Sequence, residues 1–237
     1  MRVTPMLAFM LACNLAAAAR ADVPAPTVPR PIVVELFTSE GCSSCPPADA
    51  MLSELAQTRK DVLPLGFHVT YWNGLGWRDP YSLDAATERQ QRYIGLSDMG
   101  GVYTPQMVIE GAHDVVGSDR PEVQRILQQA AATLRDAAPV TLGHDGTGIT
   151  ISVGAGKGTG TVWLIGYDPS ERTAVGRGEN AGRTLVESNV VRSLTPVAEW
   201  RGDALALHHA PPAGMRVAVI VQAPDGSILG AGVPPQS

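Results

Sequence analysis

The sequence predicts an α/β domain with the element order β-α-β-α-β-β-α, followed by an antiparallel all-β, sandwich-like domain. In the first half of the chain, apolar strands alternate with segments whose apolar residues recur at helical spacing. Beyond residue 139 only period-two alternation and Gly-rich breaks remain. We therefore expect one domain at 32–138 and a β domain at 139–232, with the boundary near Pro139.

The N-terminal 21 residues have the anatomy of an export signal. Arg2 supplies a positive start, residues 6–19 are almost uninterruptedly apolar, and Ala19-Arg20-Ala21 is a small-x-small cleavage pattern. Cleavage near Ala21 would remove Cys13 and deliver the chain to the periplasm or the medium, where disulfides persist. An uncleaved anchor and a lipoprotein attached through Cys13 are the alternatives. Residues 22–31, rich in Pro and Ala, are then a linker.

The elements follow one another regularly from Ile32. A buried strand at 32–38 leads to a helix from Pro46 to Thr58, which its first-turn prolines can start. The pattern then predicts a strand at 62–71, a helix at 82–93, a hairpin of strands 107–110 and 114–117, and a helix capped by Asp119 with Glu122 three residues on. This is the element order of the thioredoxin fold, and we expect residues 32–138 to complete a sheet covered by helices and to fold alone.

Composition excludes some functions. The chain has 18 basic and 23 acidic residues and a formal net charge of −5, and its only lysines are Lys60 and Lys157. Nucleic acid is therefore an unsuitable partner, because phosphate binding needs clustered Lys and Arg. No segment after the signal is apolar and long enough to span a bilayer. Nothing in the sequence calls for a cofactor.

Cys42 and Cys45 are the only cysteines left after signal cleavage. Such a pair can be half of a zinc site, a structural clip or a redox disulfide. We expect no metal, because the chain offers no second cysteine pair and no histidine at ligand spacing. In the redox interpretation Cys42 lies beyond the helix end, is the more exposed sulfur and attacks, while Cys45 resolves the mixed disulfide. Free amides at the helix start should face the first sulfur.

Three more residues are candidates for the same chemistry. Thr104 and Pro105 precede the predicted hairpin, where the thioredoxin fold carries a cis-proline loop facing the disulfide; an ordinary trans proline is the alternative. Glu35 lies in the apolar strand before the cysteines and could be a buried acid that relays a proton to the resolving cysteine, or an outward-facing strand residue. Asp49, one turn into the helix, is expected to be solvated.

Partner-binding residues are predicted at two places. Trp72, Trp77 and Tyr103 could line a ligand or partner site. In the Gly-rich segment after residue 175, Arg177 and Glu179, together with Arg192, could form a polar contact for a partner or for the first domain; a Gly-rich turn with a solvated ion pair is the alternative.

Four segments carry a family resemblance: VVELFTSEGCSSCPPAD, FHVTYWNGLGWRDPY, VYTPQMVIEG and GRGENAGRTLVESNVVR. Together they resemble a bacterial family of secreted thioredoxin-like proteins catalogued as a domain of unknown function. Asn73 is a departure, because similar proteins tend to carry Asp there. The resemblance implies the thioredoxin-like fold with an added β domain and an enzymatic role without an assigned substrate.

Two functions remain. The first is an exported thiol-disulfide oxidoreductase or disulfide chaperone that acts on protein thiols or disulfides through Cys42 and Cys45, together with a redox partner. The second is a non-enzymatic binding module, for a protein partner or copper, in which the disulfide is structural.

Overall fold

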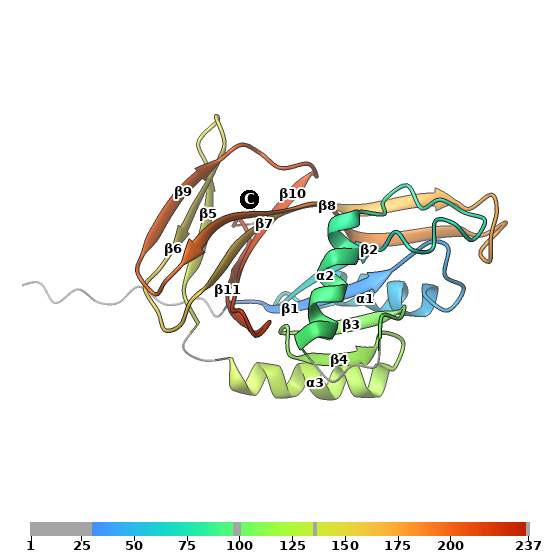
Figure 1. The fold of residues 1–237 in the computed structure, drawn as a ribbon, viewed down its shortest axis with the longest axis horizontal. Helices are drawn as coiled ribbons and strands as arrows, with labels where there is room; N and C mark the ends of the chain where they lie inside the picture. The colour runs from blue at the N-terminus through green and yellow to red at the C-terminus, as the bar shows by residue number, and fades with distance from the viewer. Residues whose placement is uncertain (1–29, 97–100, 135–136, 236–237) are drawn as a thin grey trace, which may run out of the picture.

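The computed structural model describes residues 30–96, 101–134 and 137–235 (Figure 1). The predicted signal peptide and most of the predicted linker lie outside this range. The first part comprises β1 (Ile32–Thr38), α1 (Pro46–Thr58), β2 (Val62–His68), α2 (Asp84–Leu96), β3 (Gln106–Ile109), β4 (His113–Val116) and α3 (Arg120–Thr133). The second comprises β5 (Val140–His144), β6 (Ile149–Val153), β7 (Gly160–Ala174), β8 (Thr184–Trp200), β9 (Leu205–His209), β10 (Arg216–Gln222) and β11 (Ile228–Gly232).

The predicted architecture, a thioredoxin-like domain followed by a separate sandwich-like β domain, is wrong. Strands from both halves form one eight-stranded mixed sheet in the order β11-β10-β7-β8-β2-β1-β3-β4. A second sheet, β5-β6-β9, has three strands. The first seven elements occur in the predicted order, but their strands are only half of a larger sheet.

The reason for the difference lies at β2. In the first half of the chain β2 pairs only with β1 and would be an edge strand, yet all seven of its residues are buried. β8 covers that edge, with Gly66 opposite Val190, and Asn189 Nδ2 donates a hydrogen bond of 2.7 Å to the Pro64 carbonyl. An uncovered apolar edge is a site for aggregation, so it needs a partner. The sequence pattern beyond residue 139 indicates strands but carries no signal for which strand each of them joins.

The helices cover both faces of the large sheet. In β1, Val34 and Leu36 pack against α1 and α3, whereas Val33 and Phe37 point to the opposite face, which α2 covers. The α2 face is continuous with side chains of the second half, because its apolar cluster also contains residues of β7, β8, β10 and β11. The two halves therefore share a hydrophobic core.

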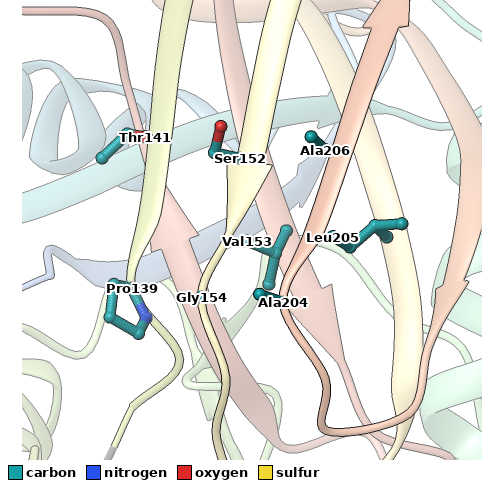
Figure 2. Close-up of a pocket in the computed structure, with 8 residues that line it drawn as sticks. All are labelled: Pro139, Thr141, Ser152, Val153, Gly154, Ala204, Leu205 and Ala206. Atoms are coloured by element: carbon teal, nitrogen blue, oxygen red, sulfur yellow. The ribbon is translucent and has the colours of Figure 1, made fainter.

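The three-stranded sheet packs on the large sheet through Leu142 and Ile151, which contact side chains of β7, β8 and β10. Its outer face bears a pocket between β6 and its neighbours (Figure 2), lined by Pro139, Thr141, Ser152, Val153, Gly154, Ala204, Leu205 and Ala206. Its polar side chains are two hydroxyls, and no predicted site residue lies there.

β7 and β8 form a long hairpin that connects this region to the candidate site. They pair from Gly160 and Trp200 at one end to Ala174 and Thr184 at the other. The turn that joins them, residues 175–183, is called the hairpin tip below. It lies against the loop between β1 and α1, which holds both cysteines.

Candidate functional site

Cys42 and Cys45 are joined by a disulfide, as predicted. β1 ends at Thr38, and two tight turns follow, closed by Cys42 N–H donating to the Ser39 carbonyl and Cys45 N–H donating to the Cys42 carbonyl. Helix α1 begins at the residue after Cys45. The disulfide thus closes a small ring at the helix N-terminus.

The start of α1 differs from the expectation that free amides face the first sulfur. Residues 46 and 47 are prolines, which have no N–H. The next two amides, those of Ala48 and Asp49, both donate to the Cys45 carbonyl, at 2.8 and 3.1 Å. The Cys42 sulfur instead lies 3.3 Å from the Ser44 hydroxyl oxygen.

The expectation that Cys42 is the more exposed sulfur is also wrong. Both cysteines are 0% exposed, although Ser43 and Ser44 between them are exposed. The reason is a covering segment far along the chain. The position of Cys42 relative to the start of the helix gives no information about this covering segment.

That segment is the hairpin tip. The Asn180 side chain, 1% exposed, donates through Nδ2 to the carbonyls of Glu40 and Cys42, each at 2.9 Å. Arg183 donates to Asn180 Oδ1 at 2.8 Å and so fixes the orientation of the amide. Beside it, a Glu179 carboxylate oxygen accepts from Ser43 N–H at 3.0 Å. Hydrogen bonding with the Ser43 side chain, together with this backbone bond, lowers the pKa of the Glu179 carboxyl.

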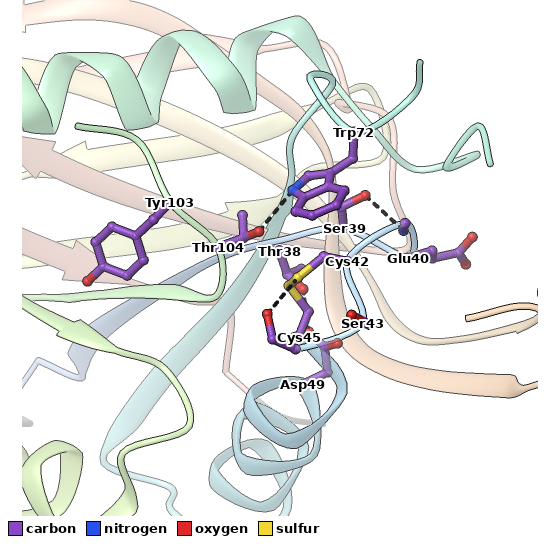
Figure 3. The surroundings of a disulfide bond; sticks show 12 residues. Thr38, Ser39, Glu40, Cys42, Ser43, Cys45, Asp49, Trp72, Tyr103 and Thr104 are labelled. Atoms are coloured by element: carbon purple, nitrogen blue, oxygen red, sulfur yellow. Dashed lines mark hydrogen bonds between the residues drawn. A yellow bond between two sulfur atoms is a disulfide. The ribbon is translucent and has the colours of Figure 1, made fainter. Parts of the chain in front are cut away.

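Trp72 and Trp77 complete the cover. Trp72 packs beside Gly41, and its Nε1 donates to Thr104 Oγ1 at 2.9 Å (Figure 3). Trp77 donates to Glu40 Oε2 at 2.7 Å and lies against Gly178 of the hairpin tip. The 72–77 loop and the hairpin tip therefore meet over the cysteine loop.

The Thr104–Pro105 peptide bond is cis, as predicted. Thr104 lies beside the Trp72 indole and near the disulfide, whereas the Tyr103 ring points away (Figure 3). The Tyr103 hydroxyl donates to Asp114 Oδ1 at 2.9 Å. Of the three aromatic residues predicted as a partner surface, the two tryptophans lie over the cysteine loop and Tyr103 lies apart.

Glu35 is buried but engaged elsewhere. Its carboxylate forms an ion pair with Arg89, including an Nη2–Oε1 contact of 2.8 Å, and accepts from the Tyr93 hydroxyl at 2.7 Å. Both partners belong to α2, on the sheet face opposite α1. These contacts favour a structural role. The proton relay predicted for Glu35 stays a prediction.

The predicted polar cluster of the second half is divided. Glu179 contacts the cysteine loop, so this residue of the cluster meets the first half of the chain, which is one of the contacts that the sequence predicts. Arg192 instead lies over the Tyr81 ring and 3.6 Å from Asp168. Arg177 is an exposed residue of the hairpin tip.

A buried ionisable cluster beneath the disulfide was missed by the sequence interpretation. Asp49, expected to be solvated, is 6% exposed and accepts from Thr38 Oγ1 at 2.7 Å. His68 lies at the end of β2, next in register to Thr38 at the end of β1, and its Nδ1 is 2.7 Å from Asp79 Oδ2. The cluster also contains Glu40 and Glu187. A usable signal was present, since polar residues at the carboxyl ends of adjacent parallel strands lie at one sheet edge.

The pKa values of this cluster are shifted far from normal. Burial raises the pKa of Glu187 to about 8 and that of Asp49 to about 6. Burial alone would lower the pKa of His68, but the negative charge of Asp79, with that of Glu187, outweighs it and raises the pKa to about 10. Burial also raises the pKa of Glu40. Both Glu187 oxygens are buried without a hydrogen-bond partner, and Glu187 Oε1 lies 3.9 Å from His68 Nε2.

The described ranges contain no arrangement of three or more His, Cys, Asp or Glu side chains suited to a metal ion. Within the same ranges no helix has the length and apolarity needed to cross a membrane. The site combines the disulfide with buried carboxyl groups beside it that can carry protons.

Two solved structures resemble this chain. Protein AGR_C_4864 from Agrobacterium tumefaciens is 32% identical, with a TM-score of 0.74 over 85% of this chain and 92% of that one. HBP35 of Porphyromonas gingivalis is 14% identical, with a TM-score of 0.55 over 86% of this chain and 74% of that one, a likeness in fold alone.

No curated protein matches the sequence significantly. The family described as "Protein of unknown function (DUF1223)" matches residues 33–222, which include both cysteines, the cis proline and the hairpin tip. The chain therefore belongs to this family of proteins of unknown function.

Proposed function

We propose that this protein is an exported thiol-disulfide oxidoreductase that exchanges the Cys42–Cys45 disulfide with the thiols or disulfides of other proteins. The observation that carries the proposal is the pairing of this two-residue-spaced disulfide with Asp49, a buried carboxyl group one helical turn beyond Cys45. Side chains at i and i+4 of a helix share a face, and Asp49 lies beside Cys45 in Figure 3.

The two sulfurs have different roles in this mechanism. The hairpin tip bonds the Cys42 carbonyl and the Ser43 amide, so Cys42 is the sulfur that a partner would reach first when the tip moves. In the reduced protein Cys42 attacks a substrate disulfide and forms a mixed disulfide, and Cys45 then attacks the Cys42 sulfur to release the substrate as a thiol.

Asp49 would serve the second step. Its pKa of about 6 leaves it mostly ionised at neutral pH, so it can accept the proton that Cys45 loses when it attacks. We assign this role to Asp49 in preference to Glu35, because the Glu35 carboxylate is bound by Arg89 and Tyr93 on the other side of the sheet.

The burial of both cysteines requires that the site open. The hairpin tip is held over it by one hydrogen bond from Ser43 N–H to Glu179, two from Asn180, and the packing of Gly178 against Trp77. Glu179 is exposed, so water competes for its hydrogen bond at little cost. We propose that a partner protein reaches Cys42 when the hairpin tip moves away.

The same burial supports a second candidate function, a binding module in which the disulfide only clips the cysteine loop. A disulfide with 0% exposure at both cysteines is protected from exchange as long as its cover stays closed. In this alternative the tryptophan-lined cover, and not the sulfur chemistry, meets the partner.

Single-cysteine variants distinguish the two functions, each made with Cys13→Ala so that no other cysteine competes. Cys45→Ser should form a stable mixed disulfide with a disulfide-containing model substrate such as unfolded, oxidised ribonuclease, because the Cys42 thiol attacks the substrate disulfide and no Cys45 thiol is left to release the substrate. Cys42→Ser should form much less. Equal, slow trapping by both variants that appears only under unfolding conditions would support the structural clip instead.

A further inference from the structure

We propose that the Cys42–Cys45 couple works as an electron donor to protein disulfides, with both sulfurs held as neutral thiols at neutral pH and the pair restored after each turnover by a protein dithiol. This inference rests on the proposed function and adds the direction of electron flow. Three observations carry it: the burial of the sulfurs, the proline start of α1, and the sign of the charges around the cysteine loop.

The direction of electron flow depends on the protonation state of the reduced cysteine pair. A couple becomes a strong oxidant when its reduced form is stabilised, as happens when a cysteine is ionised well below neutral pH. A pair that stays as two thiols lacks that stabilisation and gives up its electrons more readily. The question is therefore whether this site favours a thiolate.

Burial and the helix dipole act in opposite directions. The positive end of a helix dipole favours a thiolate by up to about thirtyfold. Full burial disfavours a charged group by about a thousandfold or more. Both cysteines are 0% exposed, so burial is the larger effect.

Hydrogen bonding does not reverse this balance. Pro46 and Pro47 have no N–H, and the amides of Ala48 and Asp49 are used by the Cys45 carbonyl. The contact that Cys42 Sγ does make is with the neutral hydroxyl of Ser44. A single hydroxyl stabilises a thiolate far less than a cation or several amides would.

The surrounding charges also disfavour a thiolate. Carboxyl groups lie on several sides of the cysteine loop: Asp49 from α1, Asp79 from the loop after β2 and Glu179 from the hairpin tip are ionised at neutral pH. Glu40 of the cysteine loop has a raised pKa, and Glu187 of β8 keeps its proton up to about pH 8. The cations of the same region are His68, Arg183, and two exposed arginines, Arg177 of the hairpin tip and Arg78 beside Asp79. His68 is held by Asp79 at 2.7 Å, and Arg183 donates to Asn180 Oδ1.

The electron balance of the cycle follows directly. The Cys42 and Cys45 dithiol transfers two electrons and two protons to a substrate disulfide, which leaves as two thiols, while the Cys42–Cys45 bond forms. A protein dithiol then exchanges with this disulfide and is itself oxidised. The reaction that supplies electrons to this protein is therefore the oxidation of a protein dithiol. The substrates of this protein are proteins with disulfides.

The equilibrium constant for reduction of the Cys13→Ala protein by dithiothreitol, measured from pH 6 to pH 8 by thiol trapping, tests the protonation state on which the direction rests. Dithiothreitol keeps both of its thiols protonated over most of this range. If the protein does the same, both couples take up two protons and the constant stays within about twofold across the range. A rise of about tenfold per pH unit would mean that one cysteine is already ionised and would overturn the inference. A disulfide that reacts only after unfolding would instead refute the proposed function.

Charge-removing variants test the physical cause. In the reduced protein, Asp49→Asn should lower the pH at which Cys42 becomes reactive to iodoacetamide by about one unit. Glu179→Gln should lower it by less, because solvent screens the charge of an exposed carboxylate. The matched control is Glu54→Gln, which removes a carboxylate of the same helix that is paired with Arg120 on the surface, and it should leave that pH unchanged. Unchanged reactivity profiles in both site variants, or a midpoint below 7 in the unaltered protein, would contradict the account.

Discussion

The Asn180 side chain is the contact through which the hairpin tip closes the disulfide site, and its removal should open the site. Asn180→Ala deletes the hydrogen bonds to the Glu40 and Cys42 carbonyls. Each such bond contributes about 1 kcal/mol net, so the closed tip should lose about 2 kcal/mol of stability. Because about 1.4 kcal/mol is a factor of ten in an equilibrium constant, the population of open tips should rise about thirtyfold.

The rate of disulfide reduction by a limiting concentration of dithiothreitol reports this population. If the hairpin tip must open before the disulfide reacts, Asn180→Ala should be reduced up to about thirty times faster than the unaltered protein in the absence of denaturant. Arg177→Ala, at an exposed position of the same tip, is the matched control and should be reduced at the original rate. If the Asn180→Ala protein is reduced at a rate within twofold of that of the unaltered protein, the idea that the hairpin tip closes the site is refuted.

Three further predictions concern the fold and its charges. Glu35→Gln should destabilise the protein by about 3–5 kcal/mol in urea unfolding, because it leaves Arg89 buried without its partner, and Glu35→Leu with Arg89→Met should recover much of the loss; equal stability of the single and double variants would contradict this. Stability should fall as pH rises, because the folded state keeps a proton on Glu187 between about pH 4.5 and 8 and on His68 between about 6.5 and 10 that the unfolded state releases. Glu187→Gln should reduce the loss of stability below pH 8. If the difference in unfolding free energy between pH 5 and pH 8 is the same in this variant as in the unaltered protein, the raised pKa of Glu187 is excluded as a cause. A chain that ends at residue 138 should be insoluble, because it exposes the edge of β2 and the core face shared with β7 and β10; a soluble, cooperative fragment would disprove that dependence.

Local features of the fold could be predicted from the sequence because their causes are local. The helix from Pro46 to Thr58 begins and ends as predicted, since two prolines start it and its apolar stripe faces β1 and β2. The helix capped by Asp119 is also confirmed, with Asp119 accepting from Glu122 N–H at 3.2 Å. The Cys42–Cys45 disulfide and the cis Thr104–Pro105 bond likewise lie within short segments.

The long-range features could not be predicted. The pairing of β8 with β2 and the contact of Asn180 with Cys42 join segments more than a hundred residues apart. A strand's alternation records which of its faces is buried and gives no information about its neighbour. The burial of Cys42 could not be predicted for the same reason. The segment that covers Cys42 is the hairpin tip, which is distant from it in the sequence. The pattern near Thr38 and His68 did contain a signal for the polar cluster, namely two parallel strands that end in polar residues at one sheet edge.

The central claim is that the Cys42–Cys45 disulfide exchanges in the folded protein. It is tested most directly by comparing two urea midpoints for the Cys13→Ala protein: that for reduction by a brief dithiothreitol pulse, measured by thiol trapping, and that for unfolding, measured by circular dichroism. A redox-active pair is reduced well below the unfolding transition, and the pulse-treated protein regains its disulfide in mild oxidant without refolding from the unfolded state. Coincidence of the two midpoints would contradict the account and identify the disulfide as a structural clip.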